Sequence, residues 1–233
     1  MTYTPEQKKV IDAVLSIFET GKVPTPESYQ TCTILTDGAG ISYGKHQSTD
    51  KSDSLDQIVE LYIKNGGKHA EELKQYLPRL KADETATLDP KNPPAWAKYL
   101  VGVLKECGKD PVMQSAQDEV FDKGYFTPAV NIAKEVGLTK ALSLLVIYDT
   151  CIHSGPGRVA THRAAFPEKS PKNGGDEKAW VLAYIKTRRA WLLANKNPLV
   201  QKCVYRQDAL VDLINADNWD LKTPCKVRGV LIK

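Results

Sequence analysis

The chain has 233 residues, of which 42% are hydrophobic and 26% charged, a composition typical of globular proteins rather than of disordered or fibrous ones. No apolar run approaches the roughly 20 residues that a membrane-spanning helix needs, so we expect no membrane insertion. The net charge is +4, and basic residues are interleaved with acidic ones. Because nucleic-acid binders cluster their basic residues, we expect no nucleic-acid partner.

The cysteines are five in number and contain no C-x-x-C pair, which predicts free thiols rather than a zinc site or a disulfide scaffold. The first residues lack the basic and apolar regions of a secretion signal, so we expect no signal peptide in this chain. Either the protein stays in a reducing compartment or a signal has been removed.

The first helix is predicted from its start signal. Thr4 and Gln7 form a capping box with proline at the first helical position, and the apolar residues of 10–18 fall on one helical face. Gly21 supplies the stop signal. Glu19 is therefore expected in the last turn.

A β-hairpin is predicted next. Residues 31–35 are rich in β-branched side chains, residues 37–40 form an Asp-Gly turn, and residues 41–43 resume an extended pattern. The rest of the chain is expected to be helical, ending in an irregular tail. The predicted helices cover about 55–65, 69–80, 96–107, the segments opened by Pro111 and Pro128, 138–152 (a buried central helix), 176–195 and 199–214.

Glu19 and Asp37 stand out among the acidic residues because a helix followed by a hairpin can bring the helix end and the turn to opposite walls of one groove. The carbonyls at a helix C-terminus disfavour an ionised carboxylate, which suits Glu19 as a general acid. The amides of Gly38 and Gly40 favour an ionised Asp37, which suits a general base. Two carboxylates in such opposed environments are typical of glycoside hydrolysis. By spacing alone, a surface glutamate and an ordinary turn aspartate remain open.

Local sequence resembles a known family. Phe18-Glu19 and the segment LTDGAGISYG at 35–44 resemble the catalytic region of the chitosanases of glycoside hydrolase family 46, with the same separation between the two acids. Further family landmarks follow in the same order: Gln114–Asp118, Tyr125–Val130, Tyr148-Asp149, Gly155–Gly157 and Gly174–Glu177. The resemblance covers almost the whole chain.

The resemblance implies a single catalytic domain over residues 1–233 with a mainly α (α+β), two-lobed, lysozyme-like fold. One small β-hairpin would line an active-site cleft between the lobes. The implied activity is that of an inverting endo-glycoside hydrolase cleaving β-1,4 linkages of an amino-sugar polysaccharide such as chitosan. It implies no metal and no cofactor. We expect a monomer that acts outside the cell.

Roles for individual residues also follow from the resemblance. Glu19 would protonate the leaving oxygen, Asp37 would activate a water, and Ser42 would help to position that water. Inversion requires roughly 6.5–9.5 Å between the two carboxyl groups. The expected substrate-binding residues lie in the hairpin and the loop after it: Gly38, Gly40, Tyr43, His46 and Asp53. For His46 a solvated loop position remains open.

Asp149, Arg188 and Arg206 match family positions that form a charged network beneath the catalytic groups. Asp149 falls in the most apolar predicted helix, where an unpaired carboxylate is costly, so a guanidinium partner is expected. A purely structural ion pair remains open.

Three residues depart from the family pattern. Ala39 stands where an arginine is usual, and Ser54 and Asn195 replace acidic residues of the cleft. Less negative charge weakens the complementarity to polycationic chitosan. A peptidoglycan muramidase on the same scaffold, a lysin or effector released by another route, is therefore one alternative. A non-catalytic glycan-binding protein is the other, although binding alone does not require the carboxylate pair.

Overall fold

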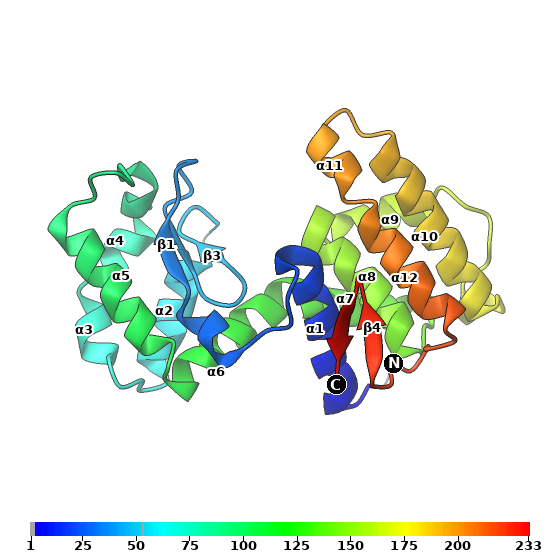
Figure 1. The fold of residues 1–233 in the computed structure, drawn as a ribbon, viewed down its shortest axis with the longest axis horizontal. Helices are drawn as coiled ribbons and strands as arrows, with labels where there is room; N and C mark the ends of the chain where they lie inside the picture. The colour runs from blue at the N-terminus through cyan, green and yellow to red at the C-terminus, as the bar shows by residue number, and fades with distance from the viewer. Residues whose placement is uncertain (1–2, 53) are drawn as a thin grey trace. The chain divides into compact units, whose positions relative to one another are not determined.

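The computed structural model describes residues 3–52 and 54–233, which form two compact units (Figure 1). The large unit joins the N-terminal segment up to Val23 to Tyr125–Lys233, and the small unit is Pro24–Gly124. Helices dominate both units, as predicted.

The large unit contains eight of the described helical segments and one hairpin. They are α1 (Pro5–Thr20), α7 (Thr127–Val136), α8 (Ala141–Ser154), α9 (Gly157–Arg163), η4 (Pro171–Asn173), α10 (Glu177–Leu193), α11 (Pro198–Lys202), α12 (Tyr205–Asn215), β4 (Cys225–Val227) and β5 (Val230–Ile232). A π-helical turn, η3 (Asp122–Phe126), leads into α7 along the chain.

Helix α1 begins and ends where the sequence predicts. The Thr4 hydroxyl accepts a hydrogen bond from the Gln7 amide at 3.2 Å, and the Gln7 side chain accepts one from the Thr4 amide at 2.9 Å. Gly21 caps the other end in the left-handed region, with φ of 76°. Glu19 accordingly lies in the last turn.

Every residue of helix α8 from Ala141 to Cys151 is buried, so the predicted central helix is confirmed. Its N-terminus is capped by Glu177, whose carboxylate accepts hydrogen bonds from the Lys140 amide at 2.9 Å and the Ser143 hydroxyl at 2.7 Å. This satisfies donors that the first turn of a helix leaves free.

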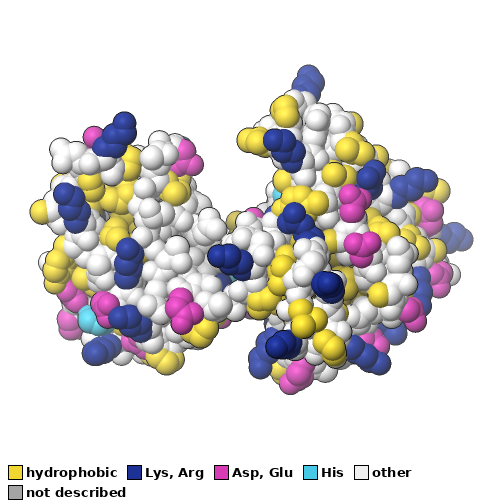
Figure 2. Space-filling model, viewed as in Figure 1, with side chains coloured by type: hydrophobic (Ala, Val, Ile, Leu, Met, Phe, Trp, Pro, Cys, Tyr) yellow, Lys and Arg dark blue, Asp and Glu magenta, His cyan; other side chains and the backbone are white. Residues whose placement is uncertain are grey.

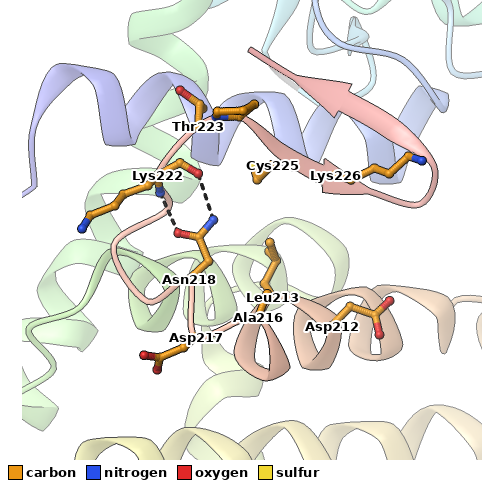
Figure 3. A pocket seen from close by; sticks show the side chains of 10 residues that line it. Asp212, Leu213, Ala216, Asp217, Asn218, Lys222, Thr223, Cys225 and Lys226 are labelled. Atoms are coloured by element: carbon orange, nitrogen blue, oxygen red, sulfur yellow. Dashed lines mark hydrogen bonds between the residues drawn. The ribbon is translucent and has the colours of Figure 1, made fainter.

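The C-terminal segment was expected to be irregular, and that expectation is wrong: strands β4 and β5 pair as an antiparallel hairpin. Each strand has only three residues, too few to give an alternation signal. Val227 and Ile232 are buried, so the hairpin packs firmly on the unit. Ahead of β4, the Asn218 side chain accepts from the Lys222 amide at 2.7 Å and donates to the Lys222 carbonyl at 2.9 Å (Figure 3).

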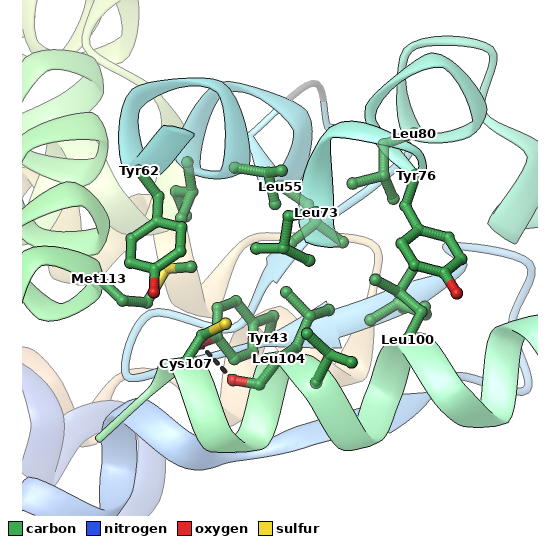
Figure 4. Close-up of a cluster of buried hydrophobic side chains, with 14 of the residues drawn as sticks. Tyr43, Leu55, Tyr62, Leu73, Tyr76, Leu80, Leu100, Leu104, Cys107 and Met113 are labelled. Atoms are coloured by element: carbon green, nitrogen blue, oxygen red, sulfur yellow. Dashed lines mark hydrogen bonds between the residues drawn. The ribbon is translucent and has the colours of Figure 1, made fainter. Parts of the chain in front are cut away.

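The small unit contains a three-stranded sheet and several helices. They are η1 (Pro26–Gln30), β1 (Cys32–Ile34), β2 (Ile41–Tyr43), β3 (Ser48–Thr49), α2 (Leu55–Lys64), α3 (Ala70–Lys74), α4 (Leu77–Lys81), η2 (Glu84–Thr87), α5 (Ala95–Cys107) and α6 (Pro111–Phe121). The strands are antiparallel in the order β1-β2-β3, with Ser42 opposite both Thr33 and Thr49. The predicted hairpin is thus confirmed, with β3 as an unforeseen third strand. A core of apolar side chains from the strands and helices fills this unit (Figure 4).

The surface carries mixed charge. On the visible face of each unit, Lys and Arg are interspersed with Asp and Glu (Figure 2). Among the described residues no helix has both the length and the apolar character needed to cross a membrane. The five cysteines are free thiols, of which Cys203 and Cys225 are partly exposed.

His162 is a buried histidine of the large unit whose protonation makes stability depend on pH. Its ring is buried edge-on against Tyr184 and Trp191, with centroids 5.9 and 5.3 Å away, and its Nε2 has no hydrogen-bond partner among the described residues. Burial, with a smaller contribution from Arg188 and Arg158, lowers the pKa of His162 to about 4.

We predict that His162 lowers stability in acid. The unfolded chain takes up a proton near the ordinary value of about 6.5, which the folded chain does not accept until about 4, so stability is full above 6.5 and falls as pH drops towards 4. His162→Phe should remove most of that loss, which is about 3 kcal/mol between pH 6.5 and 4. Urea unfolding at several pH values measures it, and an acid limb of unchanged slope would contradict the prediction.

Candidate active site

Glu19 lies on the large unit with its carboxylate half-exposed, at 47%. Its Oε1 accepts a hydrogen bond from Nη2 of Arg206, which lies in the first turn of α12 and is only 3% exposed. An exposed acid is therefore held by a buried guanidinium.

Asp149 on α8 is the centre of the same network. Its Oδ1 accepts from Arg206 Nη1 at 2.6 Å, and its Oδ2 accepts from Arg188 Nη1. Arg188 and Asp149 are both fully buried. The structure thus brings together the three residues expected to form a charged network, and it extends that network to Glu19.

Charge balance keeps this network ionised. Burial alone would raise the pKa of Asp149, but the Arg188 and Arg206 guanidiniums outweigh it and hold that pKa below its usual range. Burial would likewise lower the pKa of Arg206, but the carboxylates of Asp149 and Glu19 outweigh it and raise that pKa. The Asp149 carboxylate and the two guanidiniums therefore support one another in a fixed arrangement.

Asp37 lies on the small unit, exposed in the turn between β1 and β2. Its Oδ1 accepts a hydrogen bond from the Ala39 amide at 3.0 Å, so the side chain is fixed against its own turn. Gly38 and Gly40 both have φ near 80°, which explains why glycines follow the aspartate.

A buried pair, Asp50 and Thr85, supports this turn from below. The Thr85 hydroxyl donates to Asp50 Oδ2 at 2.6 Å and accepts from the Ile41 amide at 3.1 Å, while the Thr85 amide donates to the same carboxylate oxygen at 3.1 Å. A Cβ on Gly40 would lie 2.3 Å from the Thr85 hydroxyl, so only glycine fits there. Burial raises the pKa of Asp50, more than the Thr85 hydrogen bonds lower it.

Two of the hairpin residues have buried side chains. Ser42 is 5% exposed in the central strand β2. Tyr43 is 1% exposed and its hydroxyl donates to the Leu104 carbonyl at 2.7 Å (Figure 4). The Tyr43 side chain is therefore part of the core, which alternation along the strand could not show, and a substrate contact of Tyr43 stays a prediction for its backbone alone.

His46 belongs to a compact polar cluster rather than to a solvated loop. Its Nε2 lies 3.0 Å from Asp118 Oδ1, and its ring stacks on Phe121 with centroids 3.7 Å apart. Lys45 donates to the same carboxylate at 3.0 Å and Tyr29 at 2.7 Å. Burial would raise the pKa of Asp118, but these partners outweigh it and lower that pKa.

The substrate contact of His46 stays a prediction: its side chain is 13% exposed and makes these internal contacts in the structure. Asp53, the remaining expected substrate contact, lies outside the described residues. Within residues 3–52 and 54–233, no group of three or more His, Cys, Asp or Glu side chains is arranged to hold a metal ion.

We predict that Asp149→Asn destabilises the protein by about 3–5 kcal/mol, because two buried arginines lose their shared anion. Asp208→Asn is the matched control: Asp208 pairs with Arg189 at 2.8 Å, but both side chains are about half-exposed. Its loss should stay below about 1 kcal/mol. Urea unfolding compares the two, and equal losses would contradict a special cost of the buried charge.

A second prediction concerns the turn that carries Asp37. Thr85→Val removes the hydroxyl that binds the Ile41 amide and the shorter of the two hydrogen bonds to Asp50, while the Thr85 amide still donates to Asp50; the unpaired Ile41 amide should cost about 1–3 kcal/mol. Thr87→Val, on the exposed side of the same 3-10 helix, should change stability by less than about 0.5 kcal/mol. Chemical denaturation of the two variants checks this, and a neutral Thr85→Val would refute the supporting role.

Comparisons with known proteins identify the family of the chain. The family model of Glycosyl hydrolase family 46 matches residues 13–225. A chitosanase from Bacillus subtilis (strain 168) is 30% identical over 241 residues, covering 96% of this chain and 82% of that protein.

Solved structures extend the agreement to the fold. The native chitosanase from Bacillus subtilis MY002 superposes with a TM-score of 0.81 at 28% identity, covering the whole of both chains. A family 46 chitosanase from Gynuella sunshinyii, in complex with chitotetraose, gives a TM-score of 0.78 at 26% identity, covering 99% of this chain and 98% of that one. The predicted fold class, mainly α and lysozyme-like, is confirmed by these matches. The chain belongs to glycosyl hydrolase family 46 and is a glycoside hydrolase.

Proposed function

We propose that the chain hydrolyses the β-1,4 linkages of chitosan with inversion, using Glu19 as the proton donor and Asp37 as the general base. The observation that carries the proposal is the ion pair between the buried Arg206 and the half-exposed Glu19. Arg206 already pairs with the buried Asp149, and its second ion pair holds one oxygen of Glu19 while about half of that side chain stays open to solvent.

The Arg206 contact also directs the proton of Glu19. A guanidinium carries only donors, so the oxygen that it binds cannot present a hydrogen towards it. When Glu19 is protonated, the hydrogen therefore sits on Oε2, because Oε1 is bound to Arg206. This geometry suits donation to a leaving oxygen.

Asp37 is held by a backbone amide rather than by a charged side chain. Its Oδ1 accepts the Ala39 N–H at 3.0 Å, which fixes the orientation of the carboxyl group. The side chain is exposed to solvent, so Oδ2 can accept a proton from an attacking water. The pair divides into an acid and a base as inverting hydrolysis requires.

The relatives favour chitosan as the substrate. The Bacillus subtilis and Gynuella sunshinyii proteins are named as chitosanases, and the latter was solved with chitotetraose. None of these relatives is named for an action on peptidoglycan, so that alternative enters only as an arm of the test.

The test compares hydrolysis of chitosan by wild type, Glu19→Gln and Asp37→Asn, measured as new reducing ends. Each change should lower kcat by roughly 10²–10⁴-fold, the usual contribution of a general acid or base. Glu6→Gln, at the other end of α1, and Asp89→Asn, whose Oδ1 also accepts a turn amide at 2.9 Å, are matched controls that should keep full activity.

The same assay decides between the alternatives. Release of reducing ends from peptidoglycan but not from chitosan would identify a muramidase, and no release from either would leave a binding protein. Proton NMR of the first-formed anomer tests inversion: an α product supports it, and an initial β product would contradict it.

A further inference from the structure

We propose that Arg228, at the tip of the C-terminal hairpin, positions the proton donor Glu19 through Tyr205. The inference rests on the proposed role of Glu19. Arg228 lies beyond residues 13–225, the part of the chain that the family model matches.

Tyr205 holds the backbone next to the proposed acid. Its hydroxyl donates to the carbonyl of Phe18 at 2.5 Å, and its ring packs edge-on against the Phe18 ring with centroids 6.2 Å apart. The carbonyls in the last turn of a helix lack intrahelical partners, so this bond fixes a group that would otherwise be free to move. Phe18 immediately precedes Glu19, so the bond restrains the Glu19 backbone.

Two consecutive residues of α12 thus control one acid from two sides. Arg206 binds the Glu19 carboxylate, and Tyr205 binds the carbonyl of the residue before it. The first restraint sets the direction of the carboxyl group, and the second sets the position of the helix end that carries it.

Arg228 covers the outer face of Tyr205. Its guanidinium lies 3.8 Å from the centroid of the Tyr205 ring, within the range of a cation–π contact. The hairpin that carries Arg228 is anchored by the buried side chains of Val227 and Ile232. The stack therefore connects a fixed part of the unit to the Tyr205 ring.

The backbone of Arg228 supports a role beyond the turn itself. Arg228 and Gly229 are the two residues between β4 and β5, with φ of 49° and 84°. Two positive φ values are the pattern of a type I′ turn, which favours asparagine or glycine at the first position. An arginine there is strained, and strained residues concentrate where a side chain has a functional task.

The substitution Arg228→Asn tests the cation–π contact independently of the turn conformation. Asparagine tolerates the left-handed region, so the hairpin should remain folded, while the contact with Tyr205 is lost. We expect kcat on chitosan to fall roughly tenfold with KM unchanged, since small displacements of a catalytic group cost rate rather than binding. Hydrogen exchange of the Gly21 and Lys22 amides should become faster.

Three controls make the result specific. Asp217→Asn changes another left-handed residue of the same unit, one that pairs with Lys178 at 3.0 Å, and should leave kcat unchanged. Tyr205→Phe keeps the ring but removes the hydroxyl, and adding Arg228→Asn to it should lower kcat no further, because both changes break the same route. The third control is a β-glycosyl fluoride of the chitosan oligosaccharide, whose leaving group needs little protonation; on it the Arg228→Asn defect should largely disappear.

The outcomes distinguish the two hypotheses. Unchanged kcat in Arg228→Asn, an equal loss on the fluoride, or full additivity with Tyr205→Phe would each overturn the positioning role. Full activity of Glu19→Gln on chitosan would instead refute the proposed function itself, independently of Arg228.

Discussion

The large unit is organised around one buried charge. Asp149 lies in the middle of α8, where burial would neutralise an isolated carboxylate, and it stays ionised because α10 and α12 each supply an arginine. These ion pairs fix the three helices against one another at defined points. Because Arg206 has a second nitrogen free to reach α1, the same charge also fixes Glu19. The position of the acid is therefore a consequence of how the core charge is compensated.

Among the described residues of the small unit, the turn that carries Asp37 is supported by hydrogen bonds rather than by an ion pair. Asp50 and Thr85 support the Asp37 turn through short hydrogen bonds to the backbone, and the burial of Asp50 favours its neutral form. Among the described residues, this support consists of hydrogen bonds, whereas Glu19 is held by an ion pair with Arg206. The Asp37 side chain is itself held by the Ala39 amide.

The sequence could predict features that depend on neighbouring residues, and it missed contacts between residues far apart along the chain. The ends of α1 and the Asp-Gly hairpin follow from local rules of capping and turn formation, and the structure confirms both. The need of Asp149 for a guanidinium partner followed from the cost of an unpaired buried carboxylate, whereas the identity of the two arginines came from the family resemblance. The pairing of Asp50 with Thr85 has no such signal, since neither residue is unusual where it stands. The internal contacts of Tyr43 and His46 could not be foreseen for the same reason, because their partners Leu104 and Asp118 are more than sixty residues away along the chain.

The C-terminal hairpin shows how a missed element bears on function. Type I′ turns are predicted from Asn-Gly, whereas this turn has Arg-Gly, which does not indicate a hairpin. The same arginine is the residue whose side chain contacts Tyr205. A turn optimised for stability alone would use asparagine and lose that contact. Departures from local preference of this kind are expected where function needs a particular side chain more than the fold needs a relaxed backbone. The packed hairpin fixes Arg228, Arg228 contacts the Tyr205 ring, and the Tyr205 hydroxyl binds the Phe18 carbonyl in the last turn of α1. The strained backbone of Arg228 thus serves to restrain the end of α1.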